Sequence, residues 1–176
     1  TLICDSTTVA RMKRSDVITP ERIQHGDVIV GLASFGKCNY EDKYNSGISS
    51  NGLTLARHGT LSHIYYEKYP ECYDPNTESK YVFFGKHTLT EPLPNTSISI
   101  GEGLLSPTRT YTPVLNEILK QSRNEVHALY HCTGGAQTKC KNFGTGIKYV
   151  KNDLFKTPIM FEVIQQSSNT PWREMY

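Results

Sequence analysis

The sequence predicts a layered α/β or α+β fold, in which strands and helices alternate along the chain. Three observations predict it: a nearly continuous apolar run at 28–34, a helical spacing of apolar residues from Leu53, and a stronger helical stripe at 111–119. At 176 residues the chain is long enough for one domain with its own core, whereas two domains would be cramped.

The first fifty residues predict two strands and a loop. Residues 1–12 are rich in β-branched side chains and predict a strand. The turn 25–27 precedes a second strand, 28–34, whose unbroken apolar character is typical of a sheet covered on both faces. Residues 36–50 are polar and without period, which predicts a loop.

A helix follows, with apolar or small residues at 53, 56, 61, 64 and 65. It ends before Pro70, and Gly59 weakens its continuity by about 1 kcal/mol. Residues 70–80 then predict a loop and 81–85 a strand.

The second half contains the clearest helix, in which Tyr111, Val114, Leu115, Ile118 and Leu119 form one apolar face. Pro113 fits its first turn if Thr110 is the cap. Residues 125–132 alternate like a strand, 158–166 fit either a helix or a strand, and 169–172 predict a helix start. Both chain ends interrupt such elements, so we expect a piece of a longer polypeptide.

Composition excludes several classes of protein. A net charge of +2 gives no general field for nucleic acid or membrane, and no apolar run approaches the length of a membrane span. Five scattered cysteines without a C-x-x-C pair argue against a disulfide framework and predict reduced thiols in the cytoplasm.

The first candidate binding segment is Ser50-Asn51-Gly52, at the start of the predicted helix from Leu53. Ser50 and Asn51 can cap the helix, while Gly52 leaves room for an anion near the free N–H groups. The alternative is an ordinary N-cap.

Two further segments carry polar side chains next to predicted elements. Thr108 and Arg109 precede the clearest helix, where a guanidinium suits phosphate, although a surface arginine is equally common there. The third segment, at the end of a predicted strand, consists of His131, Thr133, Gly134 and Gly135, where ligands gather in layered α/β proteins. Its alternative is a tight turn with a packed histidine.

None of the three segments contains an obvious catalytic group. The sequence offers no nucleophile–base pair and no carboxylate cluster, so the catalytic residues stay unknown. His127 and His131 lie four apart on a predicted strand, too far from each other to chelate a metal easily, so we predict no metal site.

Five motifs in order, GDVIVGLASFG, SSNGLTLAR, LLSPTRTY, HCTGG and SNTPWREMY, closely resemble the C-terminal half of aminoimidazole ribonucleotide synthetase, also called phosphoribosylformylglycinamidine cyclo-ligase. The resemblance implies a three-layer α/β/α domain with a mixed sheet, classed as α+β. Residues 1–14 would end the preceding domain, as its last strand and linker. Residues 15–176 would form the C-terminal domain without its final strand.

In this family, ATP phosphorylates the formyl amide oxygen of formylglycinamidine ribonucleotide, and an internal nitrogen then closes the imidazole ring of a purine precursor. The resemblance implies ATP and Mg²⁺ bound mainly by the preceding domain, a homodimer, and the three segments above as substrate-binding. The family's acidic motif D-x-x-x-x-G-A-x-P is absent, so we expect this chain alone to be inactive.

The chain departs from the family pattern at three places. Residues 37–49 are an insertion of the kind that surface loops tolerate, Ser49 replaces a usual histidine, and Ala136 replaces the third glycine of H-x-T-G-G-G. Other readings are a related ATP-using enzyme, of the formylglycinamidine ribonucleotide synthetase or selenophosphate synthetase type, and a non-catalytic binding module.

Overall fold

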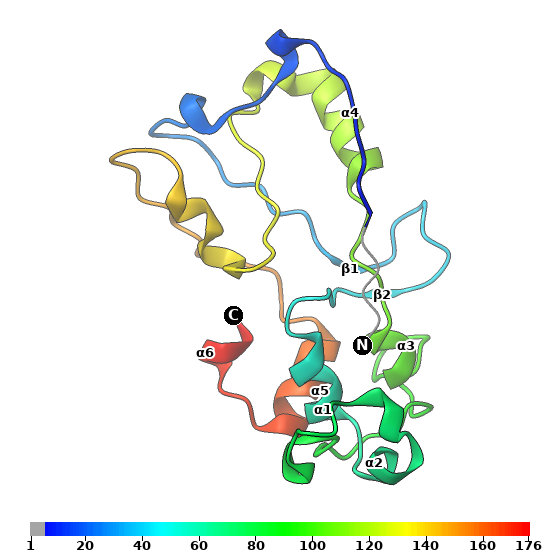
Figure 1. Ribbon diagram of the computed structural model, residues 1–176. Helices are drawn as coiled ribbons and strands as arrows, with labels where there is room; N and C mark the ends of the chain where they lie inside the picture. Colours follow the sequence, from blue (N-terminus) through cyan, green and yellow to red (C-terminus); the bar gives the residue numbers. More distant parts are fainter. Residues whose placement is uncertain (1–5) are drawn as a thin grey trace.

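The computed structural model describes residues 6–176, and Figure 1 labels its helices and strands. The helices are α1 (Leu53–Thr60), α2 (Ile64–Lys68), α3 (Ile100–Leu104), α4 (Thr112–Ser122), α5 (Ile159–Ser168) and α6 (Trp172–Met175). The 3-10 helices are η1 (Arg14–Asp16), η2 (Pro20–Arg22), η3 (Pro70–Cys72), η4 (Ser79–Tyr81), η5 (Arg123–Glu125) and η6 (Ala136–Asn142). Strands β1 (Phe35–Gly36) and β2 (Asn45–Ser46) pair antiparallel, with Phe35 opposite Ser46.

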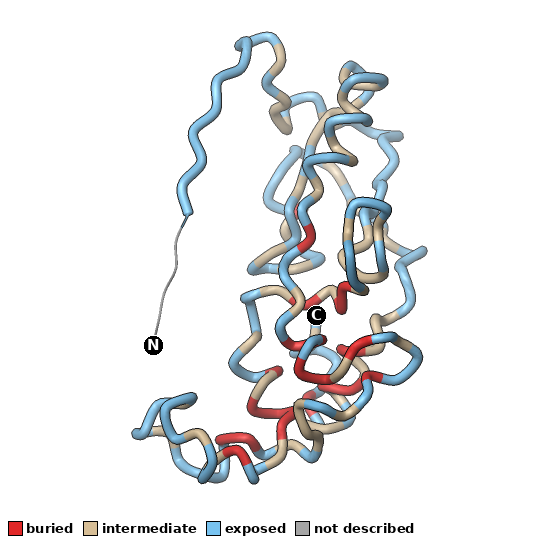
Figure 2. Tube along the Cα trace, turned by 90° about the vertical axis from the view of Figure 1, so that its right-hand side faces the viewer, coloured by how far each residue is buried: buried red, intermediate tan, exposed pale blue. Residues whose placement is uncertain are grey.

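The buried core lies at one end, where α1, α3 and α5 meet (Figure 2). Ile100 of α3 and Met160 of α5 are fully buried there, together with Val82 from the connecting chain. The capping box of α3, in which Ser99 and Glu102 bond to each other's backbone N–H, fixes the start of that helix. Helix α5 settles the open prediction at 158–166 in favour of a helix.

Glycine allows two close backbone approaches in this core. A Cβ at Gly59 would lie 2.7 Å from the Cβ of Ser168, so α1 and α5 pack closely at this point. A Cβ at Gly85 would lie 2.3 Å from the carbonyl carbon and oxygen of Thr60. Only glycine fits such spacings without a shift of the backbone.

The predicted helix from Leu53 is divided in two. Helix α1 ends at Thr60, and Leu61 turns into extended backbone, where it forms an isolated bridge with His87. Ser62 bridges Gly85 in the same way, and α2 then begins at Ile64. The break therefore comes from pairing with residues 85–87 rather than from Gly59.

Helix α4 confirms the strongest helical prediction, with Pro113 in its first turn. Its N-cap is Tyr111 instead of the predicted Thr110 and makes no side-chain cap hydrogen bond. The five residues of the predicted apolar face are only half-buried. The helix lies away from the core (Figure 1).

The long predicted strands are wrong. Residues 28–34 and 126–132 have no regular structure, and 81–85 contribute only the end of η4 and the bridge at Gly85. Residues 1–5 lie outside the described part of the chain, and 6–12 form no strand. Strands need ladder partners, and no backbone hydrogen bond pairs 28–34 with another described segment.

The exposed fractions of the side chains also contradict the predicted strand 28–34. Val28 is 85% exposed and Val30 76%, although their apolar run predicted cover on both faces. Within residues 6–176 the fold is thus α+β with one small antiparallel sheet, and the predicted three-layer mixed sheet is not present in them. Among these residues no helix combines the length and apolar character needed to cross a membrane.

Candidate functional site

Arg109 is the most heavily bonded side chain of the predicted segments. It is 7% exposed, and its Nε and Nη2 donate to the two carboxylate oxygens of Glu41 at 2.7 and 2.8 Å. Its other N–H groups donate to three backbone carbonyls, those of Ala33 (2.7 Å), Phe35 (3.0 Å) and Gly36 (3.0 Å). These bonds use all five donors of the guanidinium.

The electrostatics of this pair follow from the bidentate contact. Hydrogen bonds from Arg109 hold the pKa of Glu41 below its usual value, against the opposing effect of burial, and the N–H of Cys38 adds a bond of 2.7 Å. Glu41 in turn raises the pKa of Arg109. The alternative of a surface arginine is wrong. The predicted phosphate contact of Arg109 stays a prediction, and in this conformation it requires exchange of Glu41 or a carbonyl.

The loop around Glu41 is bound to the chain before α4 by several further contacts. Asn45 Nδ2 donates a hydrogen bond to the carbonyl of Pro107 at 2.9 Å. The hydroxyl of Tyr40 donates to the carbonyl of Thr110, also at 2.9 Å. The buried hydroxyl of Ser46 donates to the carbonyl of Gly103 at 2.7 Å. The insertion 37–49, which is largely a loop as predicted, is therefore held against the chain before α4.

The third segment lies beside the second. The ring of His131 meets that of Tyr111 edge to face, with centroids 6.2 Å apart. After it, Thr133 accepts a hydrogen bond from Lys139 Nζ, and Gly135 adopts a left-handed conformation with φ of 83°. Ala136 also has a positive φ, 39°, at the position where the family pattern has glycine.

The first segment forms the start of α1, as predicted, but not by side-chain capping. Gly52 is the N-cap, with φ of 74°, and neither Ser50 nor Asn51 places a side-chain bond there. Both residues are exposed. A cavity of about 570 Å³ opens beside Gly52, and nothing lies within 4 Å of the position of a Cβ on it.

The structure thus brings together two of the three segments. Tyr111 connects the segment of Thr108 and Arg109 with that of His131, whereas none of these residues lines the cavity beside Gly52. Thr108 itself is exposed. The role of each of these residues in binding stays a prediction.

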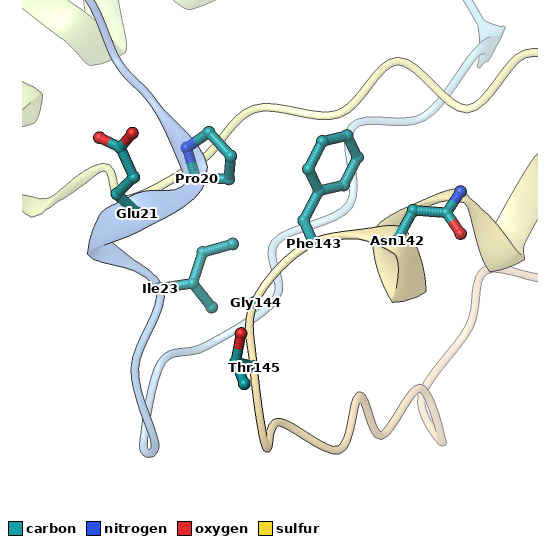
Figure 3. A pocket seen from close by; sticks show the side chains of 7 residues that line it. All are labelled: Pro20, Glu21, Ile23, Asn142, Phe143, Gly144 and Thr145. Atoms are coloured by element: carbon teal, nitrogen blue, oxygen red, sulfur yellow. The ribbon is translucent and has the colours of Figure 1, made fainter.

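A second hollow, of about 520 Å³, lies between η2 and the loop after η6 (Figure 3). Ile23 points toward this loop, while the carboxylate of Glu21 points away from it. None of the predicted site residues lines this hollow.

Sequence comparison finds proteins that are similar to this chain over most of its length. The chain is 35% identical to a phosphoribosylformylglycinamidine cyclo-ligase of Methanopyrus kandleri, over 92% of this chain and 36% of that protein. Proteins of the same name from Methanocaldococcus jannaschii (32% identical, 97% and 39% covered) and Methanothermobacter thermautotrophicus (32%, 91% and 37%) also match. This chain is homologous to part of the phosphoribosylformylglycinamidine cyclo-ligases. The predicted resemblance is confirmed.

The cyclo-ligase homology covers nearly all of this chain but only part of its relatives. The chain spans about two fifths of the length of the curated relatives that it matches. No protein-family model matches the sequence.

Two functional candidates in this cyclo-ligase homologue were missed by sequence reasoning. Glu41 lies in an aperiodic loop, and no pattern connects it with Arg109, 68 positions later. His58 lines the cavity beside Gly52, and its place one turn and a half into the predicted helix was the only available signal.

Proposed function

We propose that this chain forms the C-terminal part of an ATP-dependent cyclo-ligase that converts formylglycinamidine ribonucleotide to aminoimidazole ribonucleotide in purine biosynthesis. The observation that carries the proposal is homology to cyclo-ligases over more than nine tenths of the chain. In this proposal, residues 1–14 end the preceding domain, 15–176 belong to the C-terminal domain, and the whole enzyme is a cytoplasmic homodimer.

The proposed reaction has two steps. Bound ATP supplies a phosphoryl group to the formyl amide oxygen, which turns that oxygen into part of a leaving group. An internal nitrogen then attacks the carbon, the C–O bond breaks, and the former amide oxygen leaves in inorganic phosphate as the imidazole ring closes.

The residues of this chain would bind and orient the ribonucleotide. The start of α1 at Gly52 presents N–H groups that suit a phosphate. The turn after Thr133 presents backbone without side chains at Gly134 and Gly135, and nothing lies within 4 Å of a Cβ position on either glycine. Both features are suited to binding an anion or a hydroxyl group rather than to transferring a proton.

The described residues do not suit the Mg²⁺ that the family uses. Within residues 6–176 no three His, Cys, Asp or Glu side chains are grouped so that they could hold a metal ion. We therefore assign no step to a metal held by this chain.

A kinetic assay of the full-length protein that carries this chain tests the proposal. With ATP and formylglycinamidine ribonucleotide, we expect one aminoimidazole ribonucleotide and one inorganic phosphate for each ATP consumed. Thr133→Val removes a hydroxyl at nearly constant volume, and we expect it to raise the KM for the ribonucleotide about tenfold while the KM for ATP changes less than about twofold.

The control for this variant is Glu117→Gln, on the exposed face of α4, which should leave both KM values unchanged. Absence of ring closure by the folded full-length protein would overturn the proposed function. Equal increases in the two KM values would remove Thr133 from the ribonucleotide site.

A further inference from the structure

The side chain of Lys139 reaches back from η6 to the turn that contains Thr133. Its Nζ donates a hydrogen bond to the Oγ1 of Thr133, across six positions of the sequence. Both residues are half-buried. The contact connects a lysine that lies outside the five sequence motifs with a residue of the third predicted binding segment.

This contact determines which atom of the Thr133 hydroxyl is used. A lysine ammonium has N–H donors and no acceptor, so the oxygen of Thr133 must accept the bond. The hydroxyl of Thr133 keeps its own proton for a different acceptor. Within residues 6–176 no such acceptor lies within hydrogen-bond distance of it. Thr133 is thus a held donor without an acceptor in the described part of the chain.

Hydrogen bonds between the turn and η6 fix the backbone on which this contact depends. The N–H of Ala136 donates to the carbonyl of Thr133 at 2.8 Å. The hydroxyl of Thr138 donates to the carbonyl of Gly135 at 2.7 Å. The backbone that carries Lys139 is therefore held in place relative to Thr133.

The positive charge of Lys139 is not balanced by a neighbouring carboxylate. No Asp or Glu occurs between Glu125 and Asp153, although four lysines lie in that stretch. None of the ion pairs formed by residues 6–176 includes Lys139. A cation bonded to the oxygen of Thr133 polarises the hydroxyl and makes it a stronger donor. The acceptor that suits it best is an oxygen with negative charge or a large dipole.

The turn next to Thr133 leaves room for a ligand that carries this oxygen. Gly134 and Gly135 are exposed, and nothing lies within 4 Å of a Cβ position on either of them. A ribonucleotide has several acceptor oxygens, on its phosphate, its sugar and its amide. It can therefore supply the acceptor that the described residues do not.

We propose that Lys139 is a positioning residue of the ribonucleotide site, which holds the hydroxyl of Thr133 so that its proton is directed to an oxygen of the bound ribonucleotide. The inference rests on the proposed function, in which the turn after Thr133 binds this substrate. In the alternative, Lys139 only ties η6 to the turn.

A double-mutant cycle in the full-length protein distinguishes these two roles. We expect Lys139→Met to raise the KM for the ribonucleotide about fivefold, while kcat and the KM for ATP change less than about twofold. In a protein that already carries Thr133→Val, Lys139→Met should change the KM for the ribonucleotide less than about twofold. The reason is that the hydroxyl on which Lys139 acts is no longer present.

Two single variants serve as controls for this cycle. Lys139→Arg keeps a positively charged donor, and its KM for the ribonucleotide should lie within about twofold of the wild-type value. Lys141→Met removes an exposed lysine of the same 3-10 helix and should leave all the kinetic constants unchanged.

NMR of the full-length protein, labelled at threonine and without substrate, gives a measurement that does not depend on activity. Three-bond couplings to the methyl group of Thr133 report its χ1 rotamer. We expect one rotamer in the wild type and in Lys141→Met, and an average over rotamers in Lys139→Met, where the bond to Oγ1 is lost.

The inference is overturned if the KM effects of Lys139→Met and Thr133→Val multiply in the double mutant, or if Thr133 keeps its single rotamer in Lys139→Met. Either result, with ring closure by the wild type, leaves the proposed function standing. Absence of ring closure by the wild type refutes the proposed function, and the couplings then still decide whether Lys139 holds Thr133.

Discussion

Neutralising Glu41 should destabilise the fold far more than neutralising an exposed carboxylate. In Glu41→Gln, the guanidinium of Arg109 keeps its three carbonyl acceptors but loses the charge that balances it. The two side chains are only 5% and 16% exposed, so water replaces that charge poorly. Removal of one partner from a buried ion pair costs about 3–5 kcal/mol, and the remaining carbonyl and amide bonds place our expectation at about 3 kcal/mol.

Urea unfolding followed by circular dichroism measures this loss, with Glu117→Gln as the control. The Glu117–Lys120 pair is exposed, so its removal should cost at most about 1 kcal/mol. Because the pKa of Glu41 is lowered in the fold from 4.5, its contribution is present above pH 4.5 and is lost as the pH falls through the folded value. Equal losses in the two variants, or a difference that does not shrink in acid, would refute the reasoning.

Three further outcomes are expected. Ala136→Gly should stabilise the chain by about 1 kcal/mol in urea unfolding, because position 136 has a positive φ that favours glycine, and a loss of stability would contradict this. Gly85→Ala should destabilise it by about 3 kcal/mol because of the contact with Thr60, whereas Gly134→Ala, with open space around it, should change stability little. Since the pKa of His58 is lowered in the fold, stability should decrease as the pH falls below about 6.5, and His58→Gln should reduce this slope in thermal unfolding between pH 7.5 and 5.

The helices could be predicted from the sequence because their signals are local. The stripe from Tyr111 to Leu119 and the start at Gly52 depend on residues within a few turns, and both elements are present. The division between α1 and α2 was missed because it depends on pairing with residues 85–87.

The strand predictions were wrong because strands also depend on pairing with residues distant in the sequence. The apolar run 28–34 indicates only that an extended segment is favoured. A sheet also needs partner strands, and the run contains no information about which segments these would be. The prediction of the candidate site was limited in a similar way. Arg109 was found from its motif, but its burial and its pairing with Glu41 depend on a loop without any pattern.

The exposed apolar residues from Val28 to Leu32 have a practical consequence for the isolated chain. Their side chains, and a backbone that pairs with no other described segment, are open to any neighbouring molecule at high concentration, as at the edge of a sheet. Purified samples should therefore associate as they are concentrated, and a charged substitution such as Val30→Lys should raise the concentration at which light scattering begins.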